Sequence, residues 1–445
     1  MQNSSGSNPD VAHIPYQTIR GDIQEEARTD TSNVSVFRVL AFSACYGAFL
    51  IPSAYALPSI VFRAWQFWYL IVGAISIVLV LANCRIGFRW VGFVCFYLFY
   101  YVASTIVADS DGGLMAAGMY AMRGIGFASL LEYSLGRNRR EAMLAFIVAG
   151  VVMCAANYVT YLMYRDIAGG MRYGYVEYYQ STATTQHWFL FTHDNGSIFF
   201  YIPVIVVLWF YASAYRSKSV GITAVVFSAA TIYMYVDLWA VTAMVVTGAT
   251  VTVMAVLSFH KLGRMFTGPR LRTVFLLCAL AAILIVLFSM SDIVQNAAAY
   301  FGKTRTLNIR VSIWQKSIEW FLNNPLFGNG HEDNYTTYLK IGINHSHNFV
   351  LDILYSGGLS AAVAFVAGYL ACGRTDANRT SCQGTVLLLT GIAACFAAGC
   401  FDWYAYMVAP LALPYFYSFV TTGEDASELH AFGQAVIPNE RRHHH

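Results

Sequence analysis

The segment NHSHN at 344–348 holds the residues of this chain best suited to acid–base chemistry. It directly precedes an apolar run, and if a helix begins here, His347 and Asn348 occupy its first turn. Unpaired backbone amides and the helix dipole favour an anion at such a position. A neutral imidazole, with a reference pKa of ~6.5, can accept a proton from a hydroxyl. The same side chains could instead only cap the helix and solvate its end, so both interpretations stay open.

A metal site is a third interpretation of these histidines. His345, His347 and His331, with Glu332 or Asp333, would supply ligands of the types that zinc prefers. A His-x-His spacing alone is weak evidence for zinc, and we expect neither a metal nor another cofactor.

Cations cluster upstream of the histidines. They are Lys303, Arg305, Arg310 and Lys316, and two more, Arg165 and Arg172, lie in a separate polar segment. Guanidinium groups bind phosphate in a bidentate fashion, so several of them around a diphosphate would neutralise a leaving group. We assign this role to Arg310, one turn before Trp314, and interpret Lys316 as part of a solvated face.

The composition places these residues in a membrane protein. Of 445 residues, 57% are apolar and 11% are charged, and the mean hydropathy is +0.51. A soluble globular chain carries about 25% charged residues. A disordered chain, a nucleic-acid binder and an ordinary soluble enzyme are therefore excluded, and the net charge of +3 is small. The nine cysteines lie in apolar runs or short basic loops, which predicts free thiols.

Apolar runs near 20 residues in length predict an all-α polytopic membrane protein with about twelve transmembrane helices. The runs lie near 36–57, 66–83, 90–108, 114–134, 142–164, 197–215, 220–236, 238–258, 273–291, 347–370, 383–401 and 404–421.

Lys and Arg concentrate in alternate short loops, which predicts that these loops and both chain ends are cytoplasmic. The expected organisation is a cytoplasmic N-terminal tail at 1–34, a transmembrane domain at 35–421 and a cytoplasmic C-terminal tail at 422–445. The last tail ends in HHH, which we interpret as a tag remnant. The first 34 residues lack the pattern of a cleavable signal peptide.

A large outer loop at 292–346 interrupts the spans. Within it, Ile309, Ile313, Trp314, Ile318 and Phe321 recur at helical spacing, which predicts an amphipathic helix over 308–322 at the membrane interface. This helix should end at Asn323, Asn324 and Pro325. The glycines of PLFGNG at 325–330 then allow a turn that brings His331 toward the membrane.

These motifs resemble those of the O-antigen ligase and polymerase superfamily. The resemblance rests on RxxxW from Arg310 to Trp314, NPLFGNG at 324–330, HSHN at 345–348, and Leu351, Leu354 and GGL at 357–359. The segment FTHDNGSIFFY at 191–201 is similar to one found in capsule and exopolysaccharide polymerases, which adds His193 and Asn195 at the mouth of the site.

The resemblance implies a metal-independent, inverting glycosyltransferase that moves a glycan from an undecaprenyl diphosphate carrier to a sugar hydroxyl. It gives His347 the role of activating the acceptor and Arg310 that of binding the diphosphate. We count His345, Asn348 and Trp314 among the substrate-binding residues. Ligases of this family usually carry a second Arg at an outer tip, but the corresponding tip here, VDLWAV at 236–241, has none. Either Arg172 or Arg305 supplies that charge, or this branch binds its donor differently.

The favoured function is polymerisation of polysaccharide repeat units, as for O-antigen, capsule or exopolysaccharide. The alternatives are an O-antigen ligase that transfers the finished glycan to lipid A core or a surface acceptor, and a membrane transporter without catalysis. The expected location is the bacterial inner membrane, with the site on the periplasmic or external face. Expected partners are the carrier-linked glycan, an acceptor glycan or glycolipid and the bilayer, with a chain-length regulator or flippase as candidates and no nucleic acid.

Overall fold

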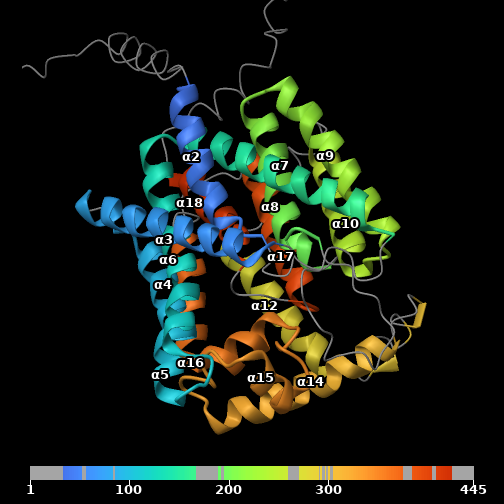
Figure 1. Ribbon diagram of the computed structural model, residues 1–445. Helices are drawn as coiled ribbons and strands as arrows, with labels where there is room; N and C mark the ends of the chain where they lie inside the picture. Colours follow the sequence, from blue (N-terminus) through green and yellow to red (C-terminus); the bar gives the residue numbers. More distant parts are fainter. Residues whose placement is uncertain are drawn as a thin grey trace, which may run out of the picture.

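The computed structural model describes residues 34–52, 57–83, 86–166, 189–191, 195–258, 270–289, 291–292, 296, 299–300, 304–373, 383–402 and 407–422. Within these ranges the chain is helical and contains no strand (Figure 1). Most of both predicted tails, 1–34 and 422–445, lies outside the described residues. Seven cysteines lie inside them, and all seven are free, as predicted.

Eight helical segments are long and apolar enough to cross a membrane. They are α3 (Ser59–Ala82), the continuous segment of α4 (Phe88–Tyr97), η1 (Leu98–Ala103) and α5 (Ser104–Ala108), α6 (Leu114–Arg137), α7 (Arg139–Tyr164), η2 with α8 (Asn195–Ser197 and Ile198–Ala214), α9 (Lys218–Asp237), α10 (Val241–Ser258) and α16 (Phe349–Cys372). Four shorter apolar segments are α2 (Val36–Phe49), α12 (Leu271–Leu287), Gly384–Gly399 within α17 (Gln383–Gly399), and Ala409–Val420 across η4 (Ala409–Leu411) and α18 (Ala412–Thr422). Every predicted run overlaps one of these helices, while the total of twelve spans stays a prediction.

The first predicted span is shorter than expected. We predicted an apolar run over 36–57, but α2 ends at Phe49 and α3 begins at Ser59. Pro52 and Pro58 flank this interval, and proline lacks the backbone N–H that a continuing helix would need. Hydropathy alone overestimated the length of this span, because a hydropathy scale does not take into account the backbone N–H that proline lacks.

Close helix packing holds the bundle together through small residues. A Cβ added to Gly92 of α4 would lie 2.6 Å from the Cα of Gly368 of α16. In the same way, a Cβ on Gly126 of α6 would lie 2.7 Å from the Cα of Gly73 of α3. Such contacts compensate for the lack of a hydrophobic driving force between helices in lipid. Helix α8 packs against α7, α9 and α17, and most of its side chains are buried.

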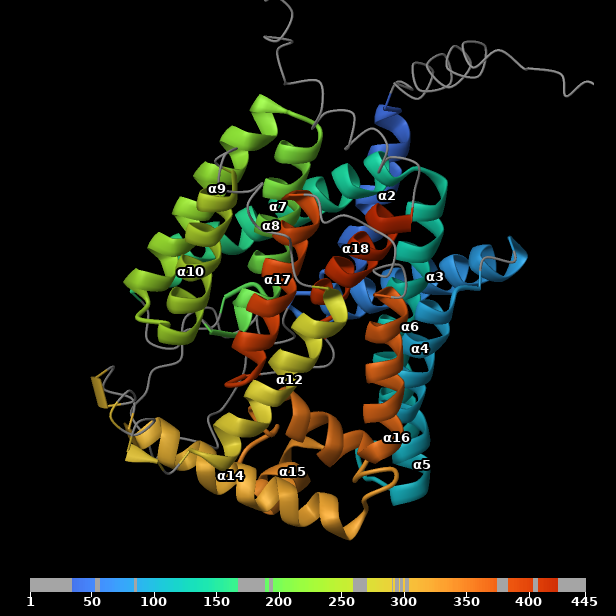
Figure 2. The same ribbon diagram turned by 180° about the vertical axis from the view of Figure 1, so that it is seen from behind.

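Helices α14 (Thr304–Asn323) and α15 (Asn334–Ile341) lie across one end of the bundle (Figures 1 and 2). Helix α14 contains the predicted amphipathic helix over 308–322 and ends at Asn323, as expected. Trp314 packs with Leu307, Val311 and Leu351, and Ile313 packs against Ile341 and Tyr355. Ile309, predicted on the apolar face, is instead 47% exposed.

The PLFGNG turn is inserted into a break in α16. Gly358 adopts a φ of 64° inside that helix, a conformation that favours glycine. The backbone groups freed by the break bond to the turn: Leu359 N donates to Pro325 O, and Ser360 N donates to Leu326 O. The turn therefore fixes the N-terminal half of α16, which begins next to the histidine segment.

Candidate functional site

Two histidines and one aspartate meet where α16 begins and α17 ends. The Oδ1 atom of Asp402 lies 2.8 Å from Nε2 of His345 and 3.2 Å from Nδ1 of His347. The two imidazole rings are 4.0 Å apart between centroids. His345 and Asp402 are buried, and His347 is the most exposed of the three, with 12% of its side chain accessible.

His347 lies just before α16, not in its first turn as predicted. Helix α16 begins at Phe349 with Asn348 as its N-cap, and His347 has a φ of 52°. This left-handed conformation is uncommon for a residue other than glycine. It places the imidazole beside Asp402 rather than along the side of the helix.

Asn348 has its hydrogen-bonding groups occupied by the protein. Its Oδ1 accepts from the backbone N–H groups of Val350 and Leu351, and its Nδ2 donates to the carbonyls of Ala282 and Cys400. The side chain is 0% exposed. Asn348 therefore caps α16 and ties it to α12 and to the end of α17.

Further bonds hold the histidine turn from two other sides. Asp352, in the first turn of α16, accepts from the Tyr100 hydroxyl at 2.6 Å and from Ser346 N at 3.4 Å. Ser317 of α14 donates to the Ser346 hydroxyl at 3.0 Å. The segment that carries both imidazoles is therefore fixed by α14, by the α4–η1 segment and by α17.

His345 has a partner at each ring nitrogen. Its Nδ1 lies 2.7 Å from Oδ1 of Asn344, and its Nε2 lies 2.8 Å from Oδ1 of Asp402. These two contacts fix the orientation of the His345 ring beside His347.

His347 is neutral in the same cluster. Burial is the main cause that lowers its pKa to about 3, and the positive charges of His345 and Arg310 act in the same direction. The bond to Asp402 opposes this shift. Because Nδ1–H of His347 donates to Asp402, its lone pair is on Nε2. His347 therefore presents an unprotonated nitrogen that can accept a proton.

Arg310 brings positive charge to this cluster from α14. Its guanidinium carbon lies 5.9 Å from the ring centroid of Phe401, the residue before Asp402. Trp314, one turn further along α14, is 1% exposed and anchors the helix against α16. In the RxxxW motif, the tryptophan thus packs and holds the helix that presents the arginine.

The residues of the alternative zinc site considered in the sequence analysis do not come together. His331 packs against Tyr101 and Tyr120, Glu332 pairs with Lys340 and accepts from Tyr355, and Asp333 caps α15. The third partner of His345 and His347 is Asp402 instead. Ligand atoms of these three residues lie within 4.8 Å of one another, so they form the set that could hold a metal ion in the described part of the chain.

Of the remaining predicted site residues, Asn195 is the one whose side chain is among the described residues. Arg172 and His193 lie outside the described residues, and Arg305 lies in α14 with a side chain that is also outside them. Asn195 accepts from the backbone N–H of Ala243 at 3.5 Å, which links η2 to the start of α10.

A cation does lie at the 236–241 tip, which lacks an arginine in the sequence. Arg165, at the end of α7, bonds to Asp237 of that tip at 3.3 Å and to the hydroxyl of Tyr161. These hydrogen bonds and the Asp237 charge raise the pKa of Arg165. Part of its charge is therefore already compensated by Asp237.

Sequence reasoning missed Asp402 and Asp352. Asp402 lies 55 residues after His347, at the end of an apolar run, and a lone acid there reads as a boundary residue. Asp352 lies inside the predicted tenth span, where an ionisable residue is costly and usually functional. Asp352 follows Asn348 by four residues, about one helical turn, and this spacing could have placed it beside the histidine segment.

Residues 237–366 match a family model described as O-antigen ligase. This confirms the resemblance to the O-antigen ligase and polymerase superfamily. The matched stretch contains Arg310, Trp314, His345 and His347, whereas Asp402 lies outside it. No curated protein matches the chain. The apolar helices indicate a multi-pass membrane protein, and the matched stretch is similar to the O-antigen ligase family.

Proposed function

We propose that this protein transfers a glycan from a polyprenyl diphosphate carrier to a sugar hydroxyl, with His347 as the general base. The observation that carries the proposal is the pairing of a neutral His347, its Nδ1–H directed at Asp402, with a nearby Arg310. A base and a phosphate-binding cation are the two groups that such a transfer needs.

In the proposed reaction, Nε2 of His347 accepts the proton of the acceptor hydroxyl. The acceptor oxygen attacks the anomeric carbon in line and forms the new glycosidic bond. The bond from that carbon to the carrier phosphate breaks, and its electron pair leaves with the diphosphate. Arg310 stabilises the charge that develops on this leaving group. A single displacement inverts the anomeric centre and needs no metal.

Burial keeps His347 unprotonated in this scheme until the anionic donor arrives, although Asp402 opposes that effect. Arg305 and Arg172 remain candidates for a further contact with the diphosphate. We place the reaction at the α14–α15 end of the bundle, on the external side of a bacterial inner membrane.

Polymerisation of carrier-linked repeat units is the favoured activity, and ligation to lipid A core or another surface acceptor is the alternative. The favoured activity rested on His193 and on a tip without an arginine. Arg165 at that tip weakens the second argument. Neither activity follows from the cluster alone, because both use the same donor chemistry and differ in the acceptor.

The experiment is a glycan-length gel in a strain that lacks the gene, complemented with wild type, His347→Ala or Arg310→Ala at matched membrane expression. Long polymer with wild type and single repeat units with both variants would support a polymerase. Polymer that accumulates on the carrier in both variants would support a ligase. Full activity in both variants would refute the assignment of the two residues. Arg310→Lys should restore little activity, because lysine cannot bind phosphate in a bidentate fashion.

A further inference from the structure

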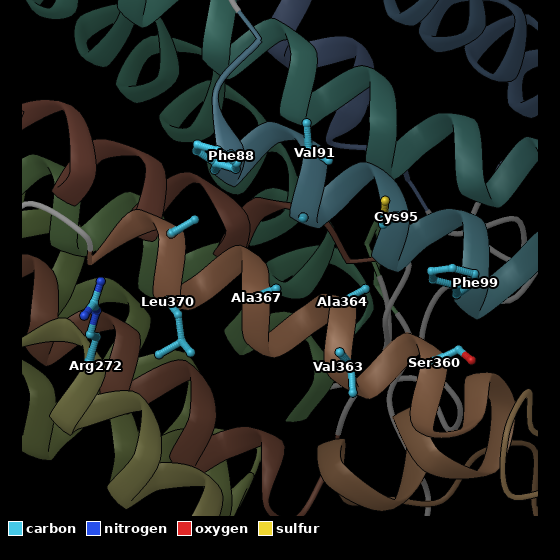
Figure 3. A pocket seen from close by; sticks show the side chains of 12 residues that line it. Phe88, Val91, Cys95, Phe99, Arg272, Ser360, Val363, Ala364, Ala367 and Leu370 are labelled. Atoms are coloured by element: carbon cyan, nitrogen blue, oxygen red, sulfur yellow. The ribbon is translucent and has the colours of Figure 1, made fainter.

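A groove of about 530 Å³ lies between α4 and α16 (Figure 3). Its walls are apolar or small side chains, among them Phe88, Cys95 and Phe99 on one side and Val363 and Ala367 on the other. The glycine contact between Gly92 and Gly368 brings the two helices together at its floor. The groove is therefore shaped by helix packing and not by a loop.

The groove follows one half of the membrane-spanning length. On α16 it extends from Ser360 to Ala371, which is about 16 Å of helix at ~1.5 Å per residue. This is close to half of the ~30 Å hydrocarbon core of a bilayer, which is the depth of one leaflet. The half concerned is the one that ends at Cys372, whereas His347 precedes the opposite end of the same helix.

A cation lies at the end of the groove near the membrane surface. Arg272, at the start of α12, lines the groove together with Leu370 and Ala371 (Figure 3). Its side chain is exposed and makes no ion pair with a described residue. Arg270 precedes it, and this basic loop belongs to the set predicted to be cytoplasmic. An apolar channel of leaflet depth with a cation at its mouth matches a lipid with an anionic headgroup.

We propose that this groove binds one acyl chain of an anionic phospholipid from the cytoplasmic leaflet, with the headgroup phosphate at Arg272. The carrier of the proposed transfer is a different lipid, because its diphosphate must reach Arg310 at the opposite end of the bundle. The phospholipid site is therefore independent of the catalytic proposal and would be retained in a catalytically inactive variant.

Two substitutions separate the headgroup from the chain. Arg272→Gln removes the charge, and Ala367→Phe fills the exposed apolar wall of the groove. Arg270→Gln is the matched control, since it removes the same net charge from a neighbouring exposed residue that does not line the groove. Leu359→Phe controls for added bulk, because Leu359 is an exposed residue of α16 outside the groove.

The measurement is native mass spectrometry of the full chain in detergent, titrated separately with phosphatidylglycerol, phosphatidylcholine and undecaprenyl phosphate. Wild type should retain phosphatidylglycerol in preference to phosphatidylcholine. Arg272→Gln should weaken phosphatidylglycerol binding about fivefold and remove the preference, since one cation near an anionic headgroup contributes about that much. Ala367→Phe should weaken both phospholipids, and the two controls should stay within about twofold of wild type.

A photoactivatable acyl chain on phosphatidylglycerol should label peptides that contain Phe88–Phe99 or Ser360–Ala371. Equal binding of both phospholipids to wild type would overturn the headgroup assignment. Unchanged binding in Arg272→Gln and Ala367→Phe would overturn the site itself. Displacement of the bound phospholipid by undecaprenyl phosphate at equal concentration would show that the groove belongs to the carrier.

Discussion

Replacing Asp402 by asparagine tests whether the carboxylate orients His347. The Oδ1 atom of Asp402 accepts from both imidazoles, at 2.8 Å from His345 and 3.2 Å from His347. An asparagine can turn its NH₂ group toward Nδ1 of His347, which would move the ring proton to Nε2. The nitrogen that faces the acceptor would then be a donor, and general-base catalysis would be lost.

The magnitude follows from the contribution of a positioned base. Proton transfer to a side chain contributes about 10²- to 10⁴-fold to a rate, so we expect Asp402→Asn to lower kcat by that factor. KM should change little, because Asp402 is 3% exposed and cannot contact substrate freely. The assay is release of undecaprenyl diphosphate from a purified carrier-linked repeat unit by protein in bilayer discs.

Asp352→Asn is the matched control for this substitution. Asp352 is 4% exposed and contacts the same turn, but it bonds to Tyr100 and to Ser346 N and touches neither imidazole. We expect it to retain activity within about tenfold of wild type. The double variant Asp402→Asn with His347→Ala should be no slower than His347→Ala alone, because both remove one function. Equal losses in Asp352→Asn and Asp402→Asn, or additive losses in the double variant, would refute the reasoning.

Three further predictions concern pH, metal and the backbone. Burial lowers the pKa of His347 to about 3, so the base is unprotonated near neutrality. We therefore expect kcat/KM to stay level as pH falls from 8 to about 5 and to drop only in stronger acid. A midpoint near 6.5 in the rate profile would contradict this. A millimolar chelator should leave turnover within about twofold, whereas a loss restored by added zinc would show that His345, His347 and Asp402 hold a metal. Gly358→Ala should lower the melting temperature, because the new Cβ would lie 2.6 Å from Gly328 N at a φ of 64°, a strain of about 1–3 kcal/mol. Gly118→Ala in α6, with no atom within 4 Å of its Cβ, should not lower it.

The sequence predicted those parts of the fold that depend on local pattern. Apolar runs gave the helices, and the spacing of Ile313, Trp314 and Ile318 gave α14, because burial on one side of a helix requires that period. The HSHN motif at 345–348, which contains His347, was also recognisable in the sequence. The exposure of Ile309 was not predicted, since the same spacing does not say how far along α14 the neighbouring helices reach.

The candidate site itself was only half predictable. Arg310 and His347 were named from the sequence as site candidates, and their roles stay a prediction. The alternative zinc set with His331 is not assembled, because the PLFGNG turn enters the break in α16 and directs His331 toward Thr105 instead. Spacing along a chain carries no information about such an insertion. The role of Asn348 as a cap with four partners likewise depends on carbonyls of α12 and α17 that are distant in sequence.

Hydropathy and helical period by themselves determined that this chain is an α-helical membrane protein with an amphipathic helix beside a histidine motif. These properties follow from the free energy of placing each side chain in lipid or water, which is set residue by residue. Only the tertiary structure decided which carboxylate the histidines meet and how low the pKa of His347 falls. Those properties depend on burial and on charges brought together from distant parts of the chain, as with His345 and Asp402, which are 57 residues apart.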